Sequence, residues 1–172
     1  MLGIVTPDLL RHFPPGVTGM EAVGMWRPRQ PVTPGMMGRA GGALRRLDAL
    51  GLSERPLEEM SSGERRRIQL ARALAHEPGA LLFDEPSTHL DLFAQAELRL
   101  ELRRLARSGI GLILVTHHLA DIIPEIDRVI LLAEGRIVGD GPKATLIEPE
   151  RLAALFGVPV EITERGGFYH AC

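Results

Sequence analysis

The feature that most constrains the fold is a short, wholly apolar run at residues 80–83, Ala-Leu-Leu-Phe, which ends in two adjacent carboxylates. A Pro-Gly pair precedes the run, and a proline follows the carboxylates. An apolar run of this length between chain breakers predicts a strand buried in a parallel sheet. The carboxyl edge of such a sheet is where α/β proteins place their chemistry. Asp84 and Glu85 are therefore candidate functional residues, with an ordinary polar strand exit as the alternative.

Composition narrows the class of protein. The chain has 172 residues, of which 45% are hydrophobic and only 4% aromatic, so a single aliphatic core is expected. The net charge of -2 argues against a surface that binds nucleic acid. The single cysteine, Cys172, cannot form an internal disulfide, which favours a reducing compartment. No apolar run reaches the roughly 18 residues of a membrane span.

The position of the single lysine excludes one common type of phosphate-binding loop. A phosphate-binding loop of the form G-x-x-x-x-G-K-[ST] needs a lysine. Lys143 is the only lysine, and it follows a proline in Gly-Pro-Lys-Ala-Thr. The sequence therefore contains no such loop.

An apolar strand is also predicted at residues 2–6, with nothing before it, so we expect the chain to begin inside a domain.

Hydrophobic periodicity predicts alternating strands and helices. Strands at 80–84 and 110–115 flank a long amphipathic helix at 90–108, which predicts a right-handed βαβ unit and a parallel sheet. Adjacent strands lie about 4.8 Å apart, so Asp84, Glu85 and His117 could converge on one ligand. The other predicted elements are helices near 18–26, 39–50, 64–76, 118–124, 142–147 and 149–156, a surface connection at 27–38, and strand pairs 127–132/136–138 and 158–163/168–171. Within the connection, Thr33 followed by Pro34 could also start a helix.

A second candidate site precedes the helix predicted at 64–76. Ser61, Ser62 and Gly63 stand at its start, where backbone N–H groups and the helix dipole favour an anion. The alternative is an ordinary helix cap followed by a basic helix.

The order of these motifs resembles the ATP-binding-cassette (ABC) ATPases. Residues 60–64 resemble the family's signature, usually Leu-Ser-Gly-Gly-Gln, and residues 81–85 resemble the Walker B strand with its following glutamate. Residues 87–91 resemble the D-loop, and His117 resembles the switch histidine. The resemblance implies an α/β, P-loop-NTPase-like nucleotide-binding domain with a mostly parallel sheet flanked by helices, lacking its N-terminal Walker A portion.

The resemblance also implies roles for particular residues. Asp84 would hold Mg²⁺ and Glu85 would act as general base on the attacking water. His117 would hydrogen-bond the γ-phosphate of ATP. The nucleotide held by a second cassette would be contacted by Ser61, Ser62, Gly63, Glu64 and Asp91. The signature departs from the usual form at three positions, including Glu64 in place of glutamine, and Pro7 stands where the family's Q-loop glutamine is expected.

The resemblance covers nearly the whole chain as one partial nucleotide-binding domain, residues 1–172. It implies a helical and signature part at about 7–76, a Walker B to switch-histidine core at about 77–140, and a C-terminal extension at about 141–172. Segments at 7–14, 116–126 and 152–160 are similar to the ATPases of molybdate and iron-complex importers.

The implied function is Mg-ATP hydrolysis that drives import of a metal complex or oxyanion. Cofactors are ATP and Mg²⁺, and the expected partners are a second cassette and membrane permease subunits. The expected place is the cytoplasmic face of a bacterial membrane, as a peripheral subunit. Without a phosphate loop, the isolated chain is expected to be inactive. Two alternatives stay open: a non-enzymatic partner that lends its signature to a complete cassette, and a soluble ABC-type ATPase.

Overall fold

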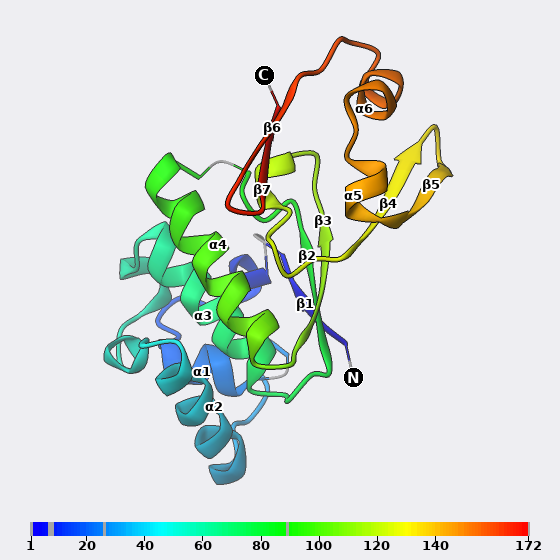
Figure 1. The fold of residues 1–172 in the computed structure, drawn as a ribbon. Helices are drawn as coiled ribbons and strands as arrows, with labels where there is room; N and C mark the ends of the chain where they lie inside the picture. The colour runs from blue at the N-terminus through cyan, green and yellow to red at the C-terminus, as the bar shows by residue number, and fades with distance from the viewer. Residues whose placement is uncertain (1, 7–8, 26, 89, 172) are drawn as a thin grey trace. The chain divides into compact units, whose positions relative to one another are not determined.

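A computed structural model gives the fold of the chain, and it describes residues 2–6, 9–25, 27–88 and 90–171 (Figure 1). These residues form two compact units, which are described separately. The first comprises residues 1–86 with 110–115, and the second comprises residues 87–109 with 116–172. Four residues on which predictions fell, Pro7, Trp26, His89 and Cys172, lie outside the described ranges.

A three-stranded parallel sheet lies in the first unit, in the order β1 (Leu2–Val5), β2 (Ala80–Asp84) and β3 (Gly111–Val115). The register places Leu82 of β2 beside Ile4 of β1 and beside Ile113 of β3. The three strands predicted from the sequence are therefore confirmed, as is their parallel arrangement.

The two faces of this sheet differ. One face buries Val5, Leu81 and Phe83, the last two at 0% and 1% exposure. On the opposite face four apolar side chains are 45–53% exposed, and we call these four the open sheet face: Leu2, Ile4, Ile113 and Val115. Parallel sheets are usually covered on both faces, so this face is unusual for its sheet type.

Three helices accompany the sheet in the first unit: α1 (Gly19–Gly24), α2 (Pro34–Arg46) and α3 (Ser62–Leu74). Capping boxes start α1 at Thr18 and α3 at Ser61. The helices pack on one another and α3 also packs on β1. Completely buried side chains at their contacts include Ala22, Leu44 and Ile68.

The predicted bounds of α2 are wrong. The helix begins at Pro34 instead of Arg39, because Thr33 caps it and Pro34 takes the first helical position. The last residues of the predicted surface connection are therefore helical. It ends at Arg46 instead of Leu50, because Asp48 turns the chain with φ 49°. Short 3-10 helices also form at Leu9–His12, Leu50–Leu52 and Leu57–Glu59.

The second unit is built from one long helix, α4 (Leu92–Arg107), and a series of short elements. These are β4 (Arg128–Ala133), β5 (Arg136–Pro142), α5 (Lys143–Leu146), α6 (Pro149–Phe156), β6 (Ile162–Arg165) and β7 (Phe168–Ala171). The two strand pairs are antiparallel hairpins, as predicted. Ile147, Leu152 and Tyr169 form the centre of their apolar core.

One predicted helix in this unit, at 118–124, is wrong. The structure has only a 3-10 turn at Leu119–Asp121, after which Ile122 leaves helical geometry with ψ 88°. Beyond this point Pro124 disfavours helical geometry at Ile123, the residue before it, and has no N–H to continue a helix. Across the described ranges, the helices are all too short or too polar to cross a membrane.

Candidate functional site

The carboxyl ends of β2 and β3 lie side by side in the first unit, as the sequence predicts. Asp84 is paired in register with Val115, the last residue of β3. The next residue, Glu85, continues the ladder, since its N–H donates to the carbonyl of Val115 at 2.8 Å. The chain then runs from Val115 into Thr116 and His117. Two polar segments therefore leave the sheet from neighbouring points on one edge.

Glu85 has an unusual backbone conformation at this edge. Its φ is 46°, in the left-handed region that non-glycine residues rarely adopt. Such conformations cost of order 1–3 kcal/mol and cluster at functional sites. The turn takes the chain out of the sheet directly after the strand. The Asp84 side chain is exposed and that of Glu85 is partly buried.

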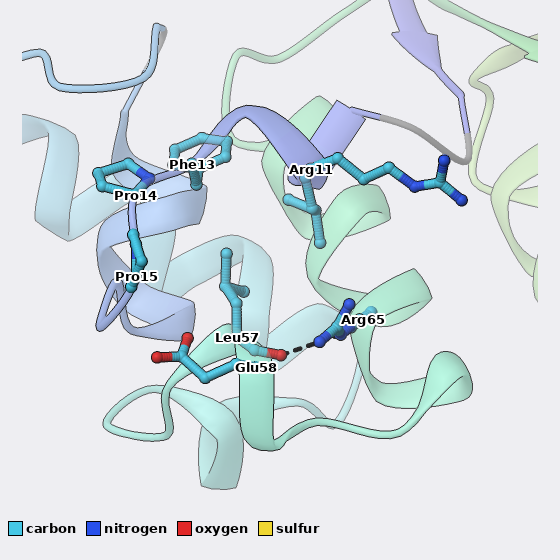
Figure 2. A pocket seen from close by; sticks show the side chains of 8 residues that line it. Arg11, Phe13, Pro14, Pro15, Leu57, Glu58 and Arg65 are labelled. Carbon is cyan, nitrogen blue, oxygen red and sulfur yellow. Dashed lines mark hydrogen bonds between the residues drawn. The ribbon is translucent and has the colours of Figure 1, made fainter.

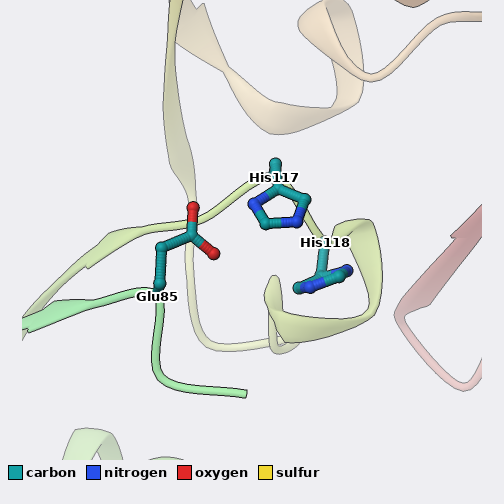
Figure 3. A group of neighbouring side chains, drawn as sticks. All are labelled: Glu85, His117 and His118. Atoms are coloured by element: carbon teal, nitrogen blue, oxygen red, sulfur yellow. The ribbon is translucent and has the colours of Figure 1, made fainter. Parts of the chain in front are cut away.

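Two adjacent histidines, His117 and His118, follow β3 in sequence and belong to the second unit. The rings of His117 and His118 have centroids 4.0 Å apart and planes inclined by 41°. Both residues are exposed to solvent. Figure 3 shows the two rings, with Glu85 drawn in the same view.

The start of α3 is a closed polar turn. Ser61 caps the helix by accepting the Glu64 N–H at 3.3 Å, and its own N–H donates to Glu64 Oε2 at 2.8 Å. The other carboxylate oxygen, Oε1, accepts a hydrogen bond from Arg55 at 2.7 Å. The Ser61 backbone N–H, followed by the Ser61 hydroxyl and then Arg55, lowers the pKa of Glu64. Glu64 therefore faces its own helix cap, and its charge is paired.

The remaining predicted signature residues are exposed. Ser62 and Gly63 occupy the first two positions of α3, and both are accessible to solvent. A Cβ added at Gly63 would meet no atom within 4 Å. The backbone of this turn is thus open to an approaching ligand. Both sequence interpretations, a helix cap and an anion site, are compatible with this geometry.

Asp91, predicted as a nucleotide-contacting residue, is the N-cap of α4. Its Oδ1 accepts the Ala94 N–H at 2.7 Å, which satisfies one of the free N–H groups at the helix start. Upstream of it, the Leu90 N–H donates to the Ser87 carbonyl at 3.2 Å. The last residue of the segment predicted as a D-loop, Asp91, therefore caps α4.

The sequence reasoning missed one buried acid, Asp121, which is 0% exposed. Its Oδ2 accepts hydrogen bonds from Ser87 Oγ at 2.6 Å and from Thr116 Oγ1 at 3.0 Å. Asp121 thus joins the segment after β2 to the segment after β3. The available signal was a single carboxylate within an apolar stretch, residues 119–124. Arg55, the partner of Glu64, was also missed, and no motif marks it.

The first unit also contains an open cavity of about 280 Å³ (Figure 2). Two of its polar side chains are hydrogen-bonded within the unit: Glu58 accepts the Gly16 N–H at 2.8 Å, and Arg65 donates to the Leu57 carbonyl at 2.9 Å. Backbone N–H groups lower the pKa of Glu58, its own first and that of Gly16 second. The lining residues are Leu10, Arg11, Phe13, Pro14, Pro15, Leu57, Glu58 and Arg65.

Comparison with known proteins places the chain in a family. Residues 9–120, more than half of the chain, match the family model described as "AAA domain, putative AbiEii toxin, Type IV TA system". The hemin import ATP-binding protein HmuV of Rhodococcus jostii is 37% identical over 122 residues, covering 71% of this chain and 42% of that protein. The aliphatic sulfonates import ATP-binding protein SsuB of Pseudomonas entomophila is 39% identical over 145 residues, covering 80% of this chain and 49% of that protein. The chain thus spans about half the length of these relatives.

A solved structure supports the same placement. The one described as "An inward-facing conformation of a putative metal-chelate type ABC transporter" superposes with a TM-score of 0.83 at 25% identity. The match covers 99% of this chain and 71% of that one. The parallel sheet with flanking helices is thus an ABC nucleotide-binding fold of the P-loop-NTPase type. With sequence relatives and fold in agreement, the chain belongs to the ABC-type ATPases, the ATP-binding proteins of ABC transporters.

Proposed function

We propose that this chain forms part of the ATP-hydrolysing subunit of an ABC-type importer. The observation that carries the proposal is the shared edge of β2 and β3. There Asp84 and Glu85 end one strand, and the neighbouring strand leads into His117. Import is the function named for both relatives, one of hemin and one of sulfonates. A metal complex or an oxyanion is therefore the proposed class of transported substrate.

The proposed roles follow from the donor chemistry of each side chain. The exposed carboxylate of Asp84 is a hard oxygen ligand of the kind that Mg²⁺ prefers, and it would hold the ion through water. Bound Mg²⁺ would neutralise charge on the β- and γ-phosphate oxygens of ATP. Glu85 would accept a proton from the attacking water, a role worth about 10²–10⁴-fold in rate. The exposed imidazole of His117 would donate to the γ-phosphate.

The start of α3 would serve a nucleotide held by another cassette. Ser61, Ser62 and Gly63 are exposed at a helix N-terminus, where backbone N–H groups favour an anion. Glu64 would maintain this turn as its cap, and the Arg55 guanidinium would offset its charge. Asp91 would hold the D-loop turn in shape for the same interface.

The proposed assembly contains a second cassette, identical or different, and membrane permease subunits. In it the chain would lie peripherally at the cytoplasmic face of the membrane. In this proposal residues 7–76 contain the signature, and residues 77–140 contact Mg²⁺, the attacking water and the γ-phosphate. Residues 141–172 form a C-terminal extension. The sequence has no phosphate loop of the lysine type, so we propose that the 172-residue chain alone does not hydrolyse ATP.

The test joins this chain to the phosphate-loop segment that it lacks. The N-terminal part of the Rhodococcus jostii relative, up to the point where its similarity to this chain begins, is fused ahead of residue 2. We expect the fusion to hydrolyse Mg-ATP and the chain alone to be inactive. Glu85→Gln in the fusion should retain ATP binding and lose hydrolysis.

Two results would contradict the proposal. Hydrolysis by the chain alone that Glu85→Gln abolishes would show that no further loop is needed. Equal loss of ATP binding and hydrolysis in the Glu85→Gln fusion would remove the general-base role. Glu101→Gln on α4 is the matched control, because it removes a carboxylate that pairs with Arg104 instead.

The non-enzymatic alternative has one observation in its favour. The turn at Ser61 to Gly63 is formed by residues of this chain alone. The chain could therefore lend its signature to a complete cassette without binding nucleotide first. Mixing it with a cassette whose own signature serine is replaced by alanine tests this, since rescue of hydrolysis that disappears with Ser61→Ala would favour the alternative.

A further inference from the structure

Asp121 is a buried acid that the proposed chemistry does not use. It ends the 3-10 turn Leu119–Asp121 and has no exposed surface. Its backbone N–H donates to the His118 carbonyl at 3.0 Å, which closes the turn. Aspartate is rarely buried completely unless its charge and its hydrogen bonds are satisfied. The hydrogen-bond donors and the cation around the Asp121 carboxylate therefore explain how it is stabilised in a buried position.

One carboxylate oxygen of Asp121 takes two hydroxyl donors. Ser87 Oγ lies 2.6 Å and Thr116 Oγ1 3.0 Å from the same Oδ2. The Thr116 hydroxyl also accepts the His118 N–H at 3.0 Å, so its single hydrogen is left to donate to Asp121. An oxygen that accepts two hydroxyl hydrogens carries no proton of its own. The bonds thus form a directed series from the His118 amide through Thr116 to Asp121.

The charge of Asp121 is balanced by α4. The Nε of Arg99 lies 3.9 Å from Oδ1, and the Arg99 side chain is held by Gln95, whose Oε1 accepts from Nη2 at 2.9 Å. Oδ1 and this Nε have no hydrogen-bond partner among the described residues, so their attraction is electrostatic. Removing the charge of Arg99 would leave the Asp121 carboxylate buried without this cation.

We infer that Asp121 is a positioning residue that couples the segment carrying Glu85 to the segment carrying His117. Ser87 is the second residue after Glu85, and Thr116 directly precedes His117. Because both hydroxyls share one oxygen, a displacement of either segment is transmitted to the other. The catalytic meaning of this coupling rests on the proposed function. The coupling itself is a property of the chain as it stands and can be measured without ATP.

The test uses histidine ring signals in ¹H–¹³C NMR spectra of the full 172-residue chain. Thr116→Val removes the hydroxyl at constant shape, and Ser87→Ala removes the other donor. We expect both variants to shift and broaden the His117 and His118 ring signals (rings in Figure 3), while His12 and His76 keep theirs. Thr116→Ser and Ser87→Thr restore the hydroxyls and should restore the signals.

A control separates coupling from lost stability. Leu44→Ala opens a cavity at a completely buried position of α2 in the first unit. It should lower the melting temperature without moving the His117 and His118 signals. If Ser87→Ala leaves those signals in place, or if Leu44→Ala moves them equally, the coupling through Asp121 is refuted. A failed ATPase test of the fusion would refute the proposed function and leave these spectra unaffected.

Discussion

The guanidinium of Arg55 lies 2.7 Å from the carboxylate of Glu64, nine residues away in sequence, and the same carboxylate accepts the N–H of Ser61. The other terminal nitrogen of Arg55 donates to the Glu59 carbonyl at 3.1 Å. An acid therefore stands where the resembled signature has glutamine, with its charge compensated inside the same turn. The start of α3 can stay attractive to an anion despite the added carboxylate.

The cap at Ser61 should contribute measurably to stability. Ser61→Ala removes the acceptor for the Glu64 N–H, so we expect the free energy of unfolding to fall by about 1 kcal/mol. Urea unfolding measures it. Ser62→Ala is the matched control, because Ser62 is equally exposed but follows the cap. Equal losses from the two variants would show that the cap does not stabilise α3.

Glu64 should also make stability depend on acid pH. Its pKa is lowered from 4.5, first by the Ser61 N–H and less by Arg55. A carboxylate with a lowered folded-state pKa stabilises the protein above its unfolded pKa, and this contribution is lost as the pH falls through the folded pKa. Below pH 4.5 we therefore expect Glu64→Gln to lose stability less steeply than the wild type, with Arg55→Met intermediate. Identical slopes for wild type and Glu64→Gln in pH-dependent thermal melts would contradict this.

Two glycines should respond oppositely to alanine. A Cβ on Gly19, at the start of α1, would lie 2.3 Å from the Leu52 carbonyl oxygen, so Gly19→Ala should cost about 1–3 kcal/mol of unfolding free energy. Gly38, within α2, has nothing within 4 Å of such a Cβ. Gly38→Ala should therefore stabilise by roughly 0.5–1 kcal/mol. Chemical unfolding of both variants measures these changes in free energy. A Gly19→Ala protein as stable as the wild type would contradict the close packing of α1 on Leu52.

Much of the fold follows from local signals in the sequence. The strands β1, β2 and β3 are apolar runs between breakers, and the β4–β5 turn is marked by Glu134-Gly135, both with positive φ. The errors have local causes too. The helix start at Thr33-Pro34 lies inside a stretch with three prolines, residues 27–38, which otherwise predicts a connection. The helix predicted at 118–124 is reduced to a 3-10 turn at Leu119–Asp121.

The candidate site divides in a similar way. Asp84, Glu85 and the Ser61 turn carry motif spacing, so the sequence points to them directly. The role of Asp121 depends on Ser87, which is 34 residues away, and no periodic pattern encodes a hydrogen bond across such a distance. The pairing of Arg55 with Glu64 is similarly invisible, because an arginine in a polar loop is ordinary without its tertiary partner.

The open sheet face should make the isolated chain self-associate and bind hydrophobic dyes. Contiguous exposed apolar side chains promote association and dye binding. We expect the double variant Ile4→Thr and Ile113→Thr, whose residues lie in register across Leu82, to lose most of the fluorescence of a bound hydrophobic dye. Leu100→Gln, on α4 at 54% exposure, is the control and should change it little. Unchanged dye binding in the double variant would show that the dye binds to a surface other than the open sheet face.

The pairing of Leu2 with Ala80 has a consequence for the timing of folding. Translation at roughly 5–20 residues per second would present β1 about 4–16 s before β2 exists to receive it. The β4–β5 hairpin, by contrast, pairs neighbouring residues and closes within about 1–10 μs once made. During synthesis β1 therefore waits for seconds before β2, its partner in the sheet, has been made.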